Sequence, residues 1–282
     1  MRKFLQFALH PVRSARLALL GACRWLGKER ALRIVRPVAW LSRKIAKDIH
    51  LFLLEVHWSP PTPEWQDQFT NMFGMWEVLG QAFLAERGVM SILAIPQDAV
   101  LLELCCGDGY YTRFFHAGRA SSVTAVDFDP TVIAFARRYH QASNVTYMVR
   151  DIRTEIPEGS FDTIIWNGAI EHFTPAEIDA ILRNLRARLK PGGILAGYTI
   201  AAISDEKQLC HHEYEFKSKE DLLRFFTPHF ANTAVYESTW PAKAGPGGCI
   251  RHNLYFFASD GPLPLGQGCP ATVRASTTKA PA

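Results

Sequence analysis

The amino-acid sequence predicts an α/β fold, in which helices cover both faces of a doubly wound, mostly parallel β-sheet. From Asp98 onward, short apolar runs alternate with amphipathic stretches, which is the pattern of strands connected by helices. Residues that favour helix starts stand before three of these stretches. The composition, 48% apolar and 21% charged over 282 residues, is that of a soluble protein with a substantial core.

Short apolar runs mark the expected strands. The first five occupy residues 99–104, 122–128, 144–149, 161–167 and 192–200. The last two, residues 233–239 and 249–259, are expected to pair with each other as a final antiparallel unit.

Capping residues place helices between these strands. Asp129 is expected to cap a helix whose first residue is Pro130. Thr174 is followed three residues later by Glu177, which is the spacing of a capping box. Ser218 is expected to cap a further helix.

Two other helices are expected around the first strand. Residues 64–87 carry apolar side chains at helical spacing, and Gly88 is expected to end that helix. A short helix is expected over residues 110–117, directly after the first strand and its glycine turn.

The sequence divides into three parts. Residues 1–63 form a basic, amphipathic helical extension, in which Pro11 and Pro37 are expected to break the helices. Residues 64–260 form the α/β domain. Residues 261–282 are rich in Pro, Gly, Ser and Thr, lack apolar residues to bury, and are expected to be disordered.

The N-terminal extension is strongly basic. Residues 1–50 contain twelve Lys and Arg but two acidic residues, so they carry +10, and the rest of the chain carries −6 of the total of +4. Basic residues interleaved with Leu, Ile and Trp are typical of a helix on an anionic membrane surface. A helical cap packed on the domain fits the same pattern. The acidic body argues against nucleic acid as a partner.

No apolar segment is long enough for a signal peptide or a membrane span. The run before the lipoprotein-like box Leu20–Cys23 holds about six residues, whereas a signal peptide needs about 7–15 and a span about 18. The six cysteines lack framework spacing and are expected to be reduced. We therefore expect a cytoplasmic protein, with peripheral contact to the inner membrane face through residues 1–58 as an open alternative.

The turn after the first strand, Cys105–Gly109, is a candidate ligand site. In an open parallel sheet, ligands bind beyond the carboxyl ends of the strands, and glycines let the backbone approach them closely. Asp127 ends the second strand, where a carboxylate can accept both hydroxyls of a ribose. Asp151 follows the third strand and can accept an amino proton from adenine. These strand ends together predict a site for an adenosine-containing cofactor.

A nicotinamide dinucleotide fits this turn poorly. With Gly107 and Gly109 as the first two glycines of the dinucleotide fingerprint, the third would fall at Thr112. The turn also lacks a basic residue that would favour a pyrophosphate. A nicotinamide-dependent dehydrogenase stays an alternative, which NAD binding would reveal.

The segments VLLELCCGDG, VTAVDFDP, VRDI and RLKPGGIL resemble, in this order, the motifs of class I S-adenosylmethionine-dependent methyltransferases. The resemblance covers about residues 98–258. It implies S-adenosylmethionine as cofactor and a seven-stranded sheet in the order 3-2-1-4-5-7-6, with strand 7 antiparallel. The cofactor-binding residues that it implies are Glu103, Cys105, Gly107, Gly109, Asp127, Phe128, Asp151, Ile152 and Asn167.

The resemblance also implies a role for each of these residues. Glu103 and the two glycines would lie beside the methionine part, Asp127 would bind the ribose, and Phe128 would flank the adenine. Asp151 and the Ile152 backbone would read the adenine edge, and Asn167 would close the site.

Cys105 departs from the family pattern because it occupies the position of the motif's first glycine. A small side chain fits there if its backbone dihedral angles are ordinary, and Cys106 occupies a variable position. We expect both thiols to line the loop rather than to take part in redox or metal chemistry.

Two histidines are candidate catalytic residues on the acceptor side. His172 follows the fourth strand and can remove a proton from an acceptor hydroxyl or amine, although a structural role fits equally. His211 lies in the segment 210–216, which is expected to contact the substrate. No metal site is expected at His211, His212 and Glu213, because adjacent residues of an extended segment point to opposite sides.

The sequence thus predicts a methyltransferase that modifies an oxygen or nitrogen of a small-molecule, glycan or lipid-linked acceptor. A sulfonium methyl is already activated, so alignment of the nucleophile supplies much of the acceleration and no single catalytic residue has to stand out. A non-catalytic nucleotide-binding scaffold, whose N-terminal part docks a partner or a membrane, is the alternative from another class. Cofactor binding without methyl transfer would favour that scaffold.

Overall fold

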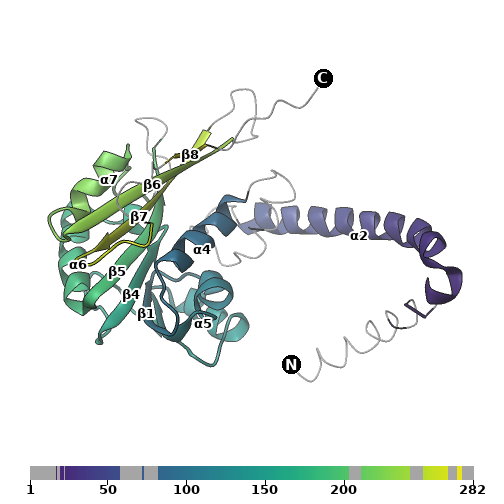
Figure 1. Ribbon diagram of the computed structural model, residues 1–282, viewed down its shortest axis with the longest axis horizontal. Helices are drawn as coiled ribbons and strands as arrows, with labels where there is room; N and C mark the ends of the chain where they lie inside the picture. The colour runs from purple at the N-terminus through teal and green to yellow at the C-terminus, as the bar shows by residue number, and fades with distance from the viewer. Residues whose placement is uncertain are drawn as a thin grey trace. The chain divides into compact units, whose positions relative to one another are not determined.

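The computed structural model describes residues 17, 20–21, 23–57, 72, 82–202, 211–241, 250–265 and 272–274 (Figure 1). The chain divides into two units, residues 1–53 and residues 54–282. The sheet and the helices that cover it belong to the second unit.

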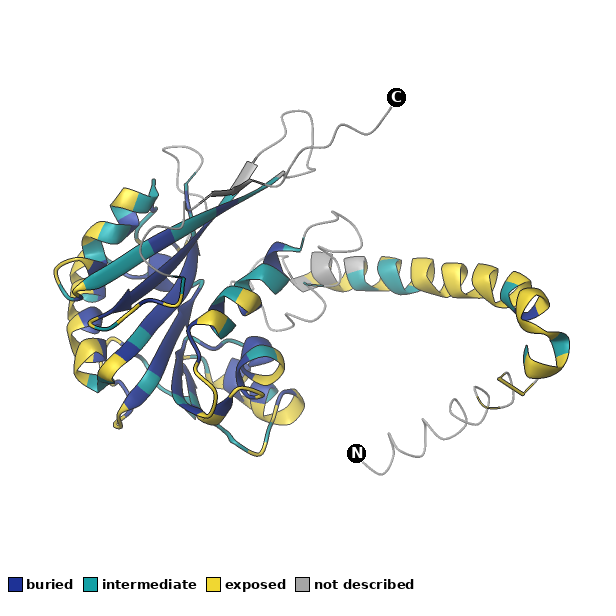
Figure 2. Cartoon of the chain, in the orientation of Figure 1, coloured by how far each residue is buried: buried dark blue, intermediate teal, exposed yellow. Residues whose placement is uncertain are grey.

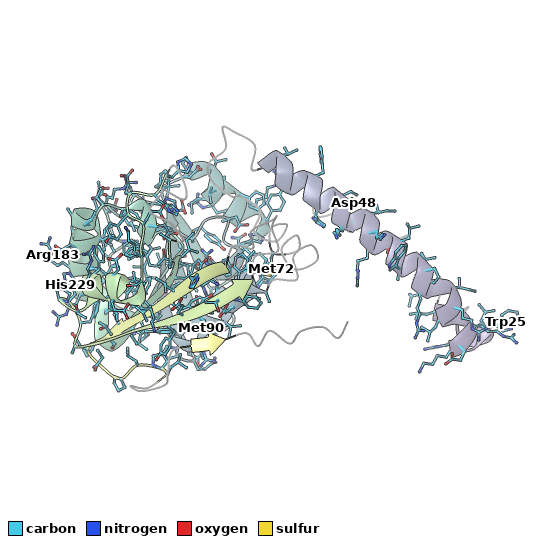
Figure 3. All side chains as sticks on the ribbon, turned by 90° about the horizontal axis from the view of Figure 1, so that it is seen from above. Trp25, Asp48, Met72, Met90, Arg183 and His229 are labelled. Atoms are coloured by element: carbon cyan, nitrogen blue, oxygen red, sulfur yellow. The ribbon has the colours of Figure 1, made fainter. Side chains whose placement is uncertain are left out.

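The main element of the first unit is helix α2, Lys28–His57. Many of its apolar side chains are exposed (Figure 2), as is Trp25 in the helical turn before it (Figure 3). Pro37 lies inside this helix, so the predicted break at that position is wrong. A proline inside a helix removes its own amide hydrogen bond and crowds the carbonyl four residues earlier, but the helix continues on both sides of it over 30 residues. Among the described residues, none of the helices combines the length and the apolar character needed to cross a bilayer.

The described strands form one sheet in the order β3-β2-β1-β4-β5-β7-β6-β8. Their bounds are β1 Ala99–Leu104, β2 Ala120–Asp127, β3 Val145–Val149, β4 Phe161–Asn167, β5 Leu189–Ile200, β6 Asn232–Pro241, β7 Ile250–Ser259 and β8 Thr272–Arg274. The first five strands pair in parallel, and β7 is antiparallel to both β5 and β6.

The seven-stranded order 3-2-1-4-5-7-6 is therefore confirmed. An eighth strand, β8, pairs in parallel with β6 and extends the sheet at that edge. Its three residues come from the C-terminal part that the composition predicts to be disordered, so pairing with β6 orders at least this short segment.

The expected helix caps are present. The Asp129 carboxylate accepts a hydrogen bond from the Thr131 amide at the start of α5, Pro130–Tyr139. Thr174 and Glu177 form the capping box of α6, Pro175–Arg188. The Ser218 hydroxyl accepts from the Asp221 amide at the start of α7, Lys219–Phe226.

The helix before β1 differs from the prediction. Helix α4 spans Phe83–Leu93 and continues through Gly88, which the sequence predicts as its end. Gly88 serves close packing instead, because a Cβ atom there would lie 2.3 Å from the Phe115 ring. Of residues 64–81, only Met72 lies within the described part of the chain. The expected helix after the glycine turn contains a π-helix, η1, at Thr112–His116.

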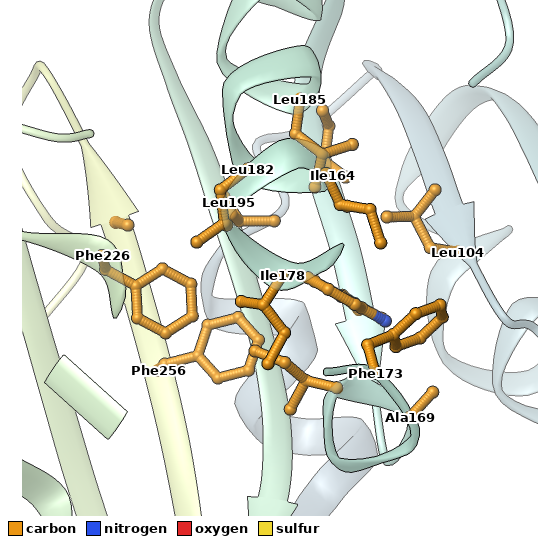
Figure 4. Packing of buried hydrophobic residues seen from close by; sticks show 14 of the residues in the cluster. Leu104, Ile164, Ala169, Phe173, Ile178, Leu182, Leu185, Leu195, Phe226 and Phe256 are labelled. Atoms are coloured by element: carbon orange, nitrogen blue, oxygen red, sulfur yellow. The ribbon is translucent and has the colours of Figure 1, made fainter. Parts of the chain in front are cut away.

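The core consists of two apolar layers, one on each face of the sheet. Alternate residues of a strand enter opposite layers, so that Leu102 and Leu104 face the side of α6 and α7 while Leu101 faces the side of α5. Figure 4 shows the first layer, where Phe226 of α7 stacks on Phe256 of β7 at a centroid distance of 4.6 Å. Burying each such side chain contributes about 1.5–3 kcal/mol, and together they hold the strand ends in fixed register.

Candidate active site

The turn Cys105–Gly109 connects β1 to the helical segment that contains η1. The Cys106 amide donates to the Val126 carbonyl of the neighbouring strand at 2.9 Å, and the Gly109 amide donates to the Cys106 carbonyl at 3.1 Å. The backbone is left-handed at Cys105, Gly107 and Gly109, with φ of +52°, +55° and +74°. Such a tight turn at the end of a buried strand exposes backbone groups at the carboxyl edge of the sheet.

The two glycines of this turn serve different purposes. A Cβ atom on Gly109 would lie 2.5 Å from the Tyr147 hydroxyl oxygen, so this position has no room for a side chain. A Cβ atom on Gly107 would meet no protein atom within 4 Å. Gly107 therefore borders open space, which is what a bound cofactor needs.

Cys105 corrects one expectation. The sequence predicts ordinary dihedral angles for a cysteine at the first glycine position of the motif, whereas the structure shows φ of +52°. A non-glycine residue in the left-handed region costs of order 1–3 kcal/mol, which the rest of the turn has to offset. The cause is the turn itself, whose hydrogen bonds to β2 fix the backbone path.

The Cys106 side chain is part of the packing. It is buried, and burial raises the pKa of its thiol well above the usual value, with the carboxylates of Glu103 and Asp127 adding to the rise. A thiol with such a pKa stays protonated at neutral pH and is a poor nucleophile or metal ligand. Cys23, Cys105 and Cys106, the cysteines in the described part of the chain, form no disulfide.

Asp127 lies at the end of β2, directly beside the turn. Its Oδ2 atom accepts a hydrogen bond from the Gly107 amide at 3.0 Å, and its Oδ1 atom accepts from the Asp129 amide at 3.1 Å. The side chain is 8% exposed. A carboxylate at this place is of the kind that accepts from both hydroxyls of a vicinal diol such as that of a ribose.

Glu103 forms a buried pair that sequence reasoning missed. Its Oε2 atom lies 2.9 Å from Nδ1 of His116 in η1, and the two residues are 3% and 0% exposed. Nε2 of His116 is buried and has no partner among the described residues. An ion or polar group in the protein interior needs a partner. A glutamate inside a buried strand is therefore the sequence signal that predicts a partner such as His116.

The three residues expected around the adenine lie after the ends of β2 and β3. Phe128 is 52% exposed, whereas Ile152 is 3% exposed and packs in the core. The Asp151 side chain is 41% exposed, and its Oδ1 atom accepts from the Arg153 amide at 3.0 Å. Asp127 pairs with Val149, which is the last residue of β3. Asp151 therefore lies two residues beyond the end of the strand that neighbours Asp127.

Asn167 closes β4 on the other side of the turn. Its Nδ2 atom donates to the Ser91 hydroxyl at 2.8 Å, while its Oδ1 atom is buried and accepts no hydrogen bond from the described residues. Arg87 of α4 donates to the Asn167 carbonyl at 3.0 Å. The Arg87 guanidinium also packs over the rings of Tyr111 and Tyr198, at 4.7 and 5.1 Å. Sequence reasoning missed Arg87, since it treats that residue only as part of a helix.

The two candidate catalytic histidines do not point the same way. Nδ1 of His172, in the short helix η2, Ile170–His172, lies 3.2 Å from the backbone carbonyl of His211. The His172 ring packs edge-on against His212, at a centroid distance of 5.2 Å. His211 is exposed while His212 is 1% exposed, so these neighbours point to opposite sides. The structure therefore brings His172 to His212 and leaves the His211 side chain outside that contact.

The strand order, the glycine turn and the adjoining carboxylate define a class I S-adenosylmethionine-dependent methyltransferase domain. Residues 101–193, which include the turn, β2, β3 and β4, match the family model described as "Methyltransferase domain". The match with this family therefore concerns the part of the chain that carries the candidate site.

Known proteins resemble parts of this chain. An uncharacterized methyltransferase of Synechocystis is 34% identical over 106 residues, which are 37% of this chain and 48% of that protein. The malonyl-[acyl-carrier protein] O-methyltransferase of Bacillus cereus is 38% identical over 96 residues, or 34% of this chain and 35% of that protein. The chain thus spans about a third to a half of the length of these curated relatives.

A solved structure shows the same fold. Phosphoethanolamine N-methyltransferase 2 of Haemonchus contortus, in complex with S-adenosyl-L-methionine, superposes with a TM-score of 0.51 at 17% identity. The match covers 62% of this chain and 52% of that chain. At this identity the likeness concerns the fold alone.

Proposed function

We propose that this protein transfers a methyl group from S-adenosylmethionine to an oxygen or nitrogen of a small-molecule, glycan or lipid-linked acceptor. The observation that carries the proposal is the Asp127 carboxylate, which two backbone amides orient beside a turn with open space above Gly107. The cofactor would supply a methyl group on a positively charged sulfur.

The residues of the turn and of the strand ends fit such a cofactor. Asp127 would accept the ribose hydroxyls, and Asp151, with one carboxylate oxygen engaged by Arg153, would accept from the adenine amino group. Phe128 is exposed enough to lie against the base. The buried Oδ1 atom of Asn167, which has no donor among the described residues, would accept from the amino-acid end.

The acceptor would approach from the ends of β4 and β5. Here the carbonyl of His211 accepts from Nδ1 of His172, which leaves Nε2 of His172 as the basic nitrogen. A neutral imidazole there can take the proton from an acceptor hydroxyl as the new bond to carbon forms. The Bacillus cereus relative is named as an O-methyltransferase, which supports an oxygen acceptor but leaves its chemical class open.

Helix α2 supports attachment to an anionic membrane surface. Its exposed apolar side chains include Ile34, Val38, Ile45 and Phe52, which recur at the spacing of one helix face. Seven Lys and Arg residues stand against three acidic ones in this helix. Each basic residue near an anionic leaflet contributes about 1 kcal/mol, and apolar side chains add to this as they enter the interface.

Titration calorimetry with S-adenosylmethionine and S-adenosylhomocysteine tests the cofactor. Asp127→Ala should weaken binding at least about 100-fold, because each hydrogen bond to a charged group contributes about 1.5–3 kcal/mol. Asp127→Asn keeps an acceptor oxygen and should lose less. Asp260→Asn is the matched control, since Asp260 binds Arg186 and the Ala231 amide just beyond the end of β7. Unchanged binding in Asp127→Ala, or binding of NAD instead, would contradict the assignment.

Radiolabelled methyl donor with fractionated lysate then tests transfer. Label should enter one chemical fraction with the wild type and not with Asp127→Ala. Tight cofactor binding without transfer to any fraction would favour the scaffold. Binding to vesicles of anionic and of neutral lipid tests the role of α2. The protein should bind the anionic vesicles, and this binding should weaken as the salt concentration rises.

A further inference from the structure

A cluster of side chains that can bind a metal ion lies beyond the end of β4. Glu171, His172 and His212 each offer one ligand atom, and these atoms all lie within 4.8 Å of one another. Glu171 and His172 come from η2 after β4, and His212 comes from the segment between β5 and α7. Glu171 is 6% exposed and His212 is 1% exposed, so two of the three side chains are deeply buried.

Each of the three side chains has an outer partner that fixes its orientation. Nδ1 of His212 lies 2.8 Å from the Glu215 carboxylate, and Nδ1 of His172 lies 3.2 Å from the His211 carbonyl. A carbonyl or carboxylate oxygen accepts a hydrogen bond, so in a neutral imidazole whose Nδ1 donates to it, Nε2 is the nitrogen whose lone pair can bind a metal.

The carboxylate of the cluster is oriented in the same way. The Thr199 hydroxyl donates to Oε2 of Glu171 at 2.9 Å, so one carboxylate oxygen is held by the protein. Histidines oriented by an outer carboxylate or carbonyl, together with an oriented carboxylate, are the usual surroundings of a bound transition metal.

The surroundings of Glu171 favour a bound cation. Four carboxylates are buried in the described part of the chain: Glu103, Asp108, Asp127 and Glu171. Glu103 pairs with His116, Asp108 lies near His140, and Asp127 accepts from two backbone amides. Among the described residues, no Lys or Arg forms an ion pair with Glu171, and the donor to its side chain is the neutral Thr199 hydroxyl. A buried carboxylate is costly unless hydrogen bonds or a cation stabilise it, and the described partners of the Glu171 side chain offer less of this than those of the other three.

We propose that Glu171, His172 and His212 bind a divalent transition-metal ion of the Zn²⁺ class. Two imidazole nitrogens and one carboxylate oxygen form a ligand set that leaves a coordination position open. Bonds of 2.0–2.1 Å at a tetrahedral ion place neighbouring ligand atoms about 3.3 Å apart. The ligand atoms of the cluster lie within 4.8 Å of one another, so a bound ion would draw them closer together.

The open position gives the ion a use in catalysis, which rests on the proposed function. An acceptor hydroxyl that binds there has a lowered pKa and releases its proton to water. Its oxygen then attacks the methyl carbon, the carbon–sulfur bond breaks, and the electron pair stays on the sulfur. Nε2 of His172 would in this case hold the ion, and the ion rather than the imidazole would promote loss of the proton.

Metal binding can be measured on the untagged chain of 282 residues. After treatment with a chelator, the protein is titrated with Zn²⁺ by calorimetry, and with Co²⁺ by visible absorption, which reports the ligand geometry. We expect one ion per chain in the wild type. His172→Ala and His212→Ala should each weaken binding by more than about 100-fold, and Glu215→Gln by about 10–100-fold, because loss of an outer partner has an effect of that size.

Two control variants separate this cluster from other histidines. His229→Gln removes a histidine that binds Asp179 near α6 (Figure 3), and it should keep full metal affinity. His211→Ala removes an exposed side chain but keeps the carbonyl that orients His172, so it should also keep the ion. If the run 211–213 were the ligand set, His211→Ala would lose the ion, and the proposed ligand set would be wrong.

The affinity for S-adenosylhomocysteine, measured on the same samples, serves as the folding control. Loss of metal with unchanged cofactor affinity supports the site. Absence of stoichiometric binding in the wild type, or equal losses in His229→Gln and His212→Ala, would overturn it. Because metal binding is measured without any methyl acceptor, a failure of this proposal is distinguishable from a failure of the methyltransferase assignment.

Discussion

Gly107 and Gly109 differ only in what surrounds them, which makes alanine at each position an informative pair. Both residues have positive φ, so alanine brings a similar backbone strain of about 1–2 kcal/mol at either place. Alanine also restricts the unfolded chain, which offsets about 0.4–1 kcal/mol. We therefore expect Gly107→Ala to lower the free energy of unfolding by about 1 kcal/mol or less.

Gly109→Ala adds a steric conflict. The new Cβ atom would lie 2.5 Å from the Tyr147 hydroxyl oxygen, and Tyr147 is held by a hydrogen bond from its hydroxyl to the His140 carbonyl at 2.9 Å. Displacing a packed side chain costs about 1–3 kcal/mol, so the total loss should be about 2–4 kcal/mol. In a domain of this size, 1 kcal/mol corresponds to about 2–4 °C in Tm.

Cofactor affinity should rank the two variants in the opposite order from stability. The space above Gly107 is open in the protein and would hold the cofactor, so Gly107→Ala should weaken S-adenosylhomocysteine binding at least about tenfold while it remains folded. Urea unfolding followed by fluorescence and titration calorimetry measure the two quantities. Equal stabilities of the variants, or full cofactor affinity in Gly107→Ala, would refute the reasoning.

Further predictions concern the packing, the thiols and the acid stability. Gly197→Ala should prevent folding or cost more than about 3 kcal/mol, because its Cβ atom would lie 2.0 Å from the Trp166 carbonyl oxygen; soluble yield and urea unfolding measure this. Cys105→Val should lose about 2 kcal/mol or more in the same unfolding assay, while Cys105→Gly should stay within about 1 kcal/mol of the wild type, since a β-branched residue fits poorly at φ of +52°. Cys106 should resist iodoacetamide at pH 8 in the folded protein and react in urea, as peptide mass spectrometry can show; rapid labelling of folded protein would contradict the raised pKa. Hydrogen bonds from the Thr174 amide and hydroxyl lower the pKa of Glu177 in the folded protein. The contribution of Glu177 to the free energy of unfolding is therefore present above the unfolded-state pKa and is lost as pH falls through the folded-state pKa. Glu177→Gln should make the loss of Tm in that acidic range less steep.

The local patterns of the sequence were sufficient to predict seven of the strands, whereas their order came from the family resemblance and the eighth strand was not predicted. Strand β4, Phe161–Asn167, coincides with its predicted bounds, because a strand buried on both faces consists mainly of apolar residues. The capping box of Thr174 and Glu177 is formed by residues three positions apart and is therefore visible in the sequence alone.

Contacts between distant segments could not be predicted in this way. The pair of Glu103 and His116 depends on how η1 packs against β1, and the contact of His172 with His212 joins residues from two different loops. Arg87 reaches the end of β4 only because α4 lies against that edge. Gly88 shows the same limitation, because a glycine chosen for close packing and a glycine that ends a helix look alike in the sequence.

The pair of amides that hold Asp127 has a consequence for selectivity. Since the carboxylate is oriented during folding, a ligand does not have to immobilise it, and the entropy cost of about 0.5–1.5 kcal/mol for one side chain is absent from the binding step. A fixed negative charge also cannot turn away from an incoming group. A ribose that carries a phosphate in place of a hydroxyl would bring like charges together at that spot, so the protein should reject phosphorylated nucleosides while it accepts the free diol.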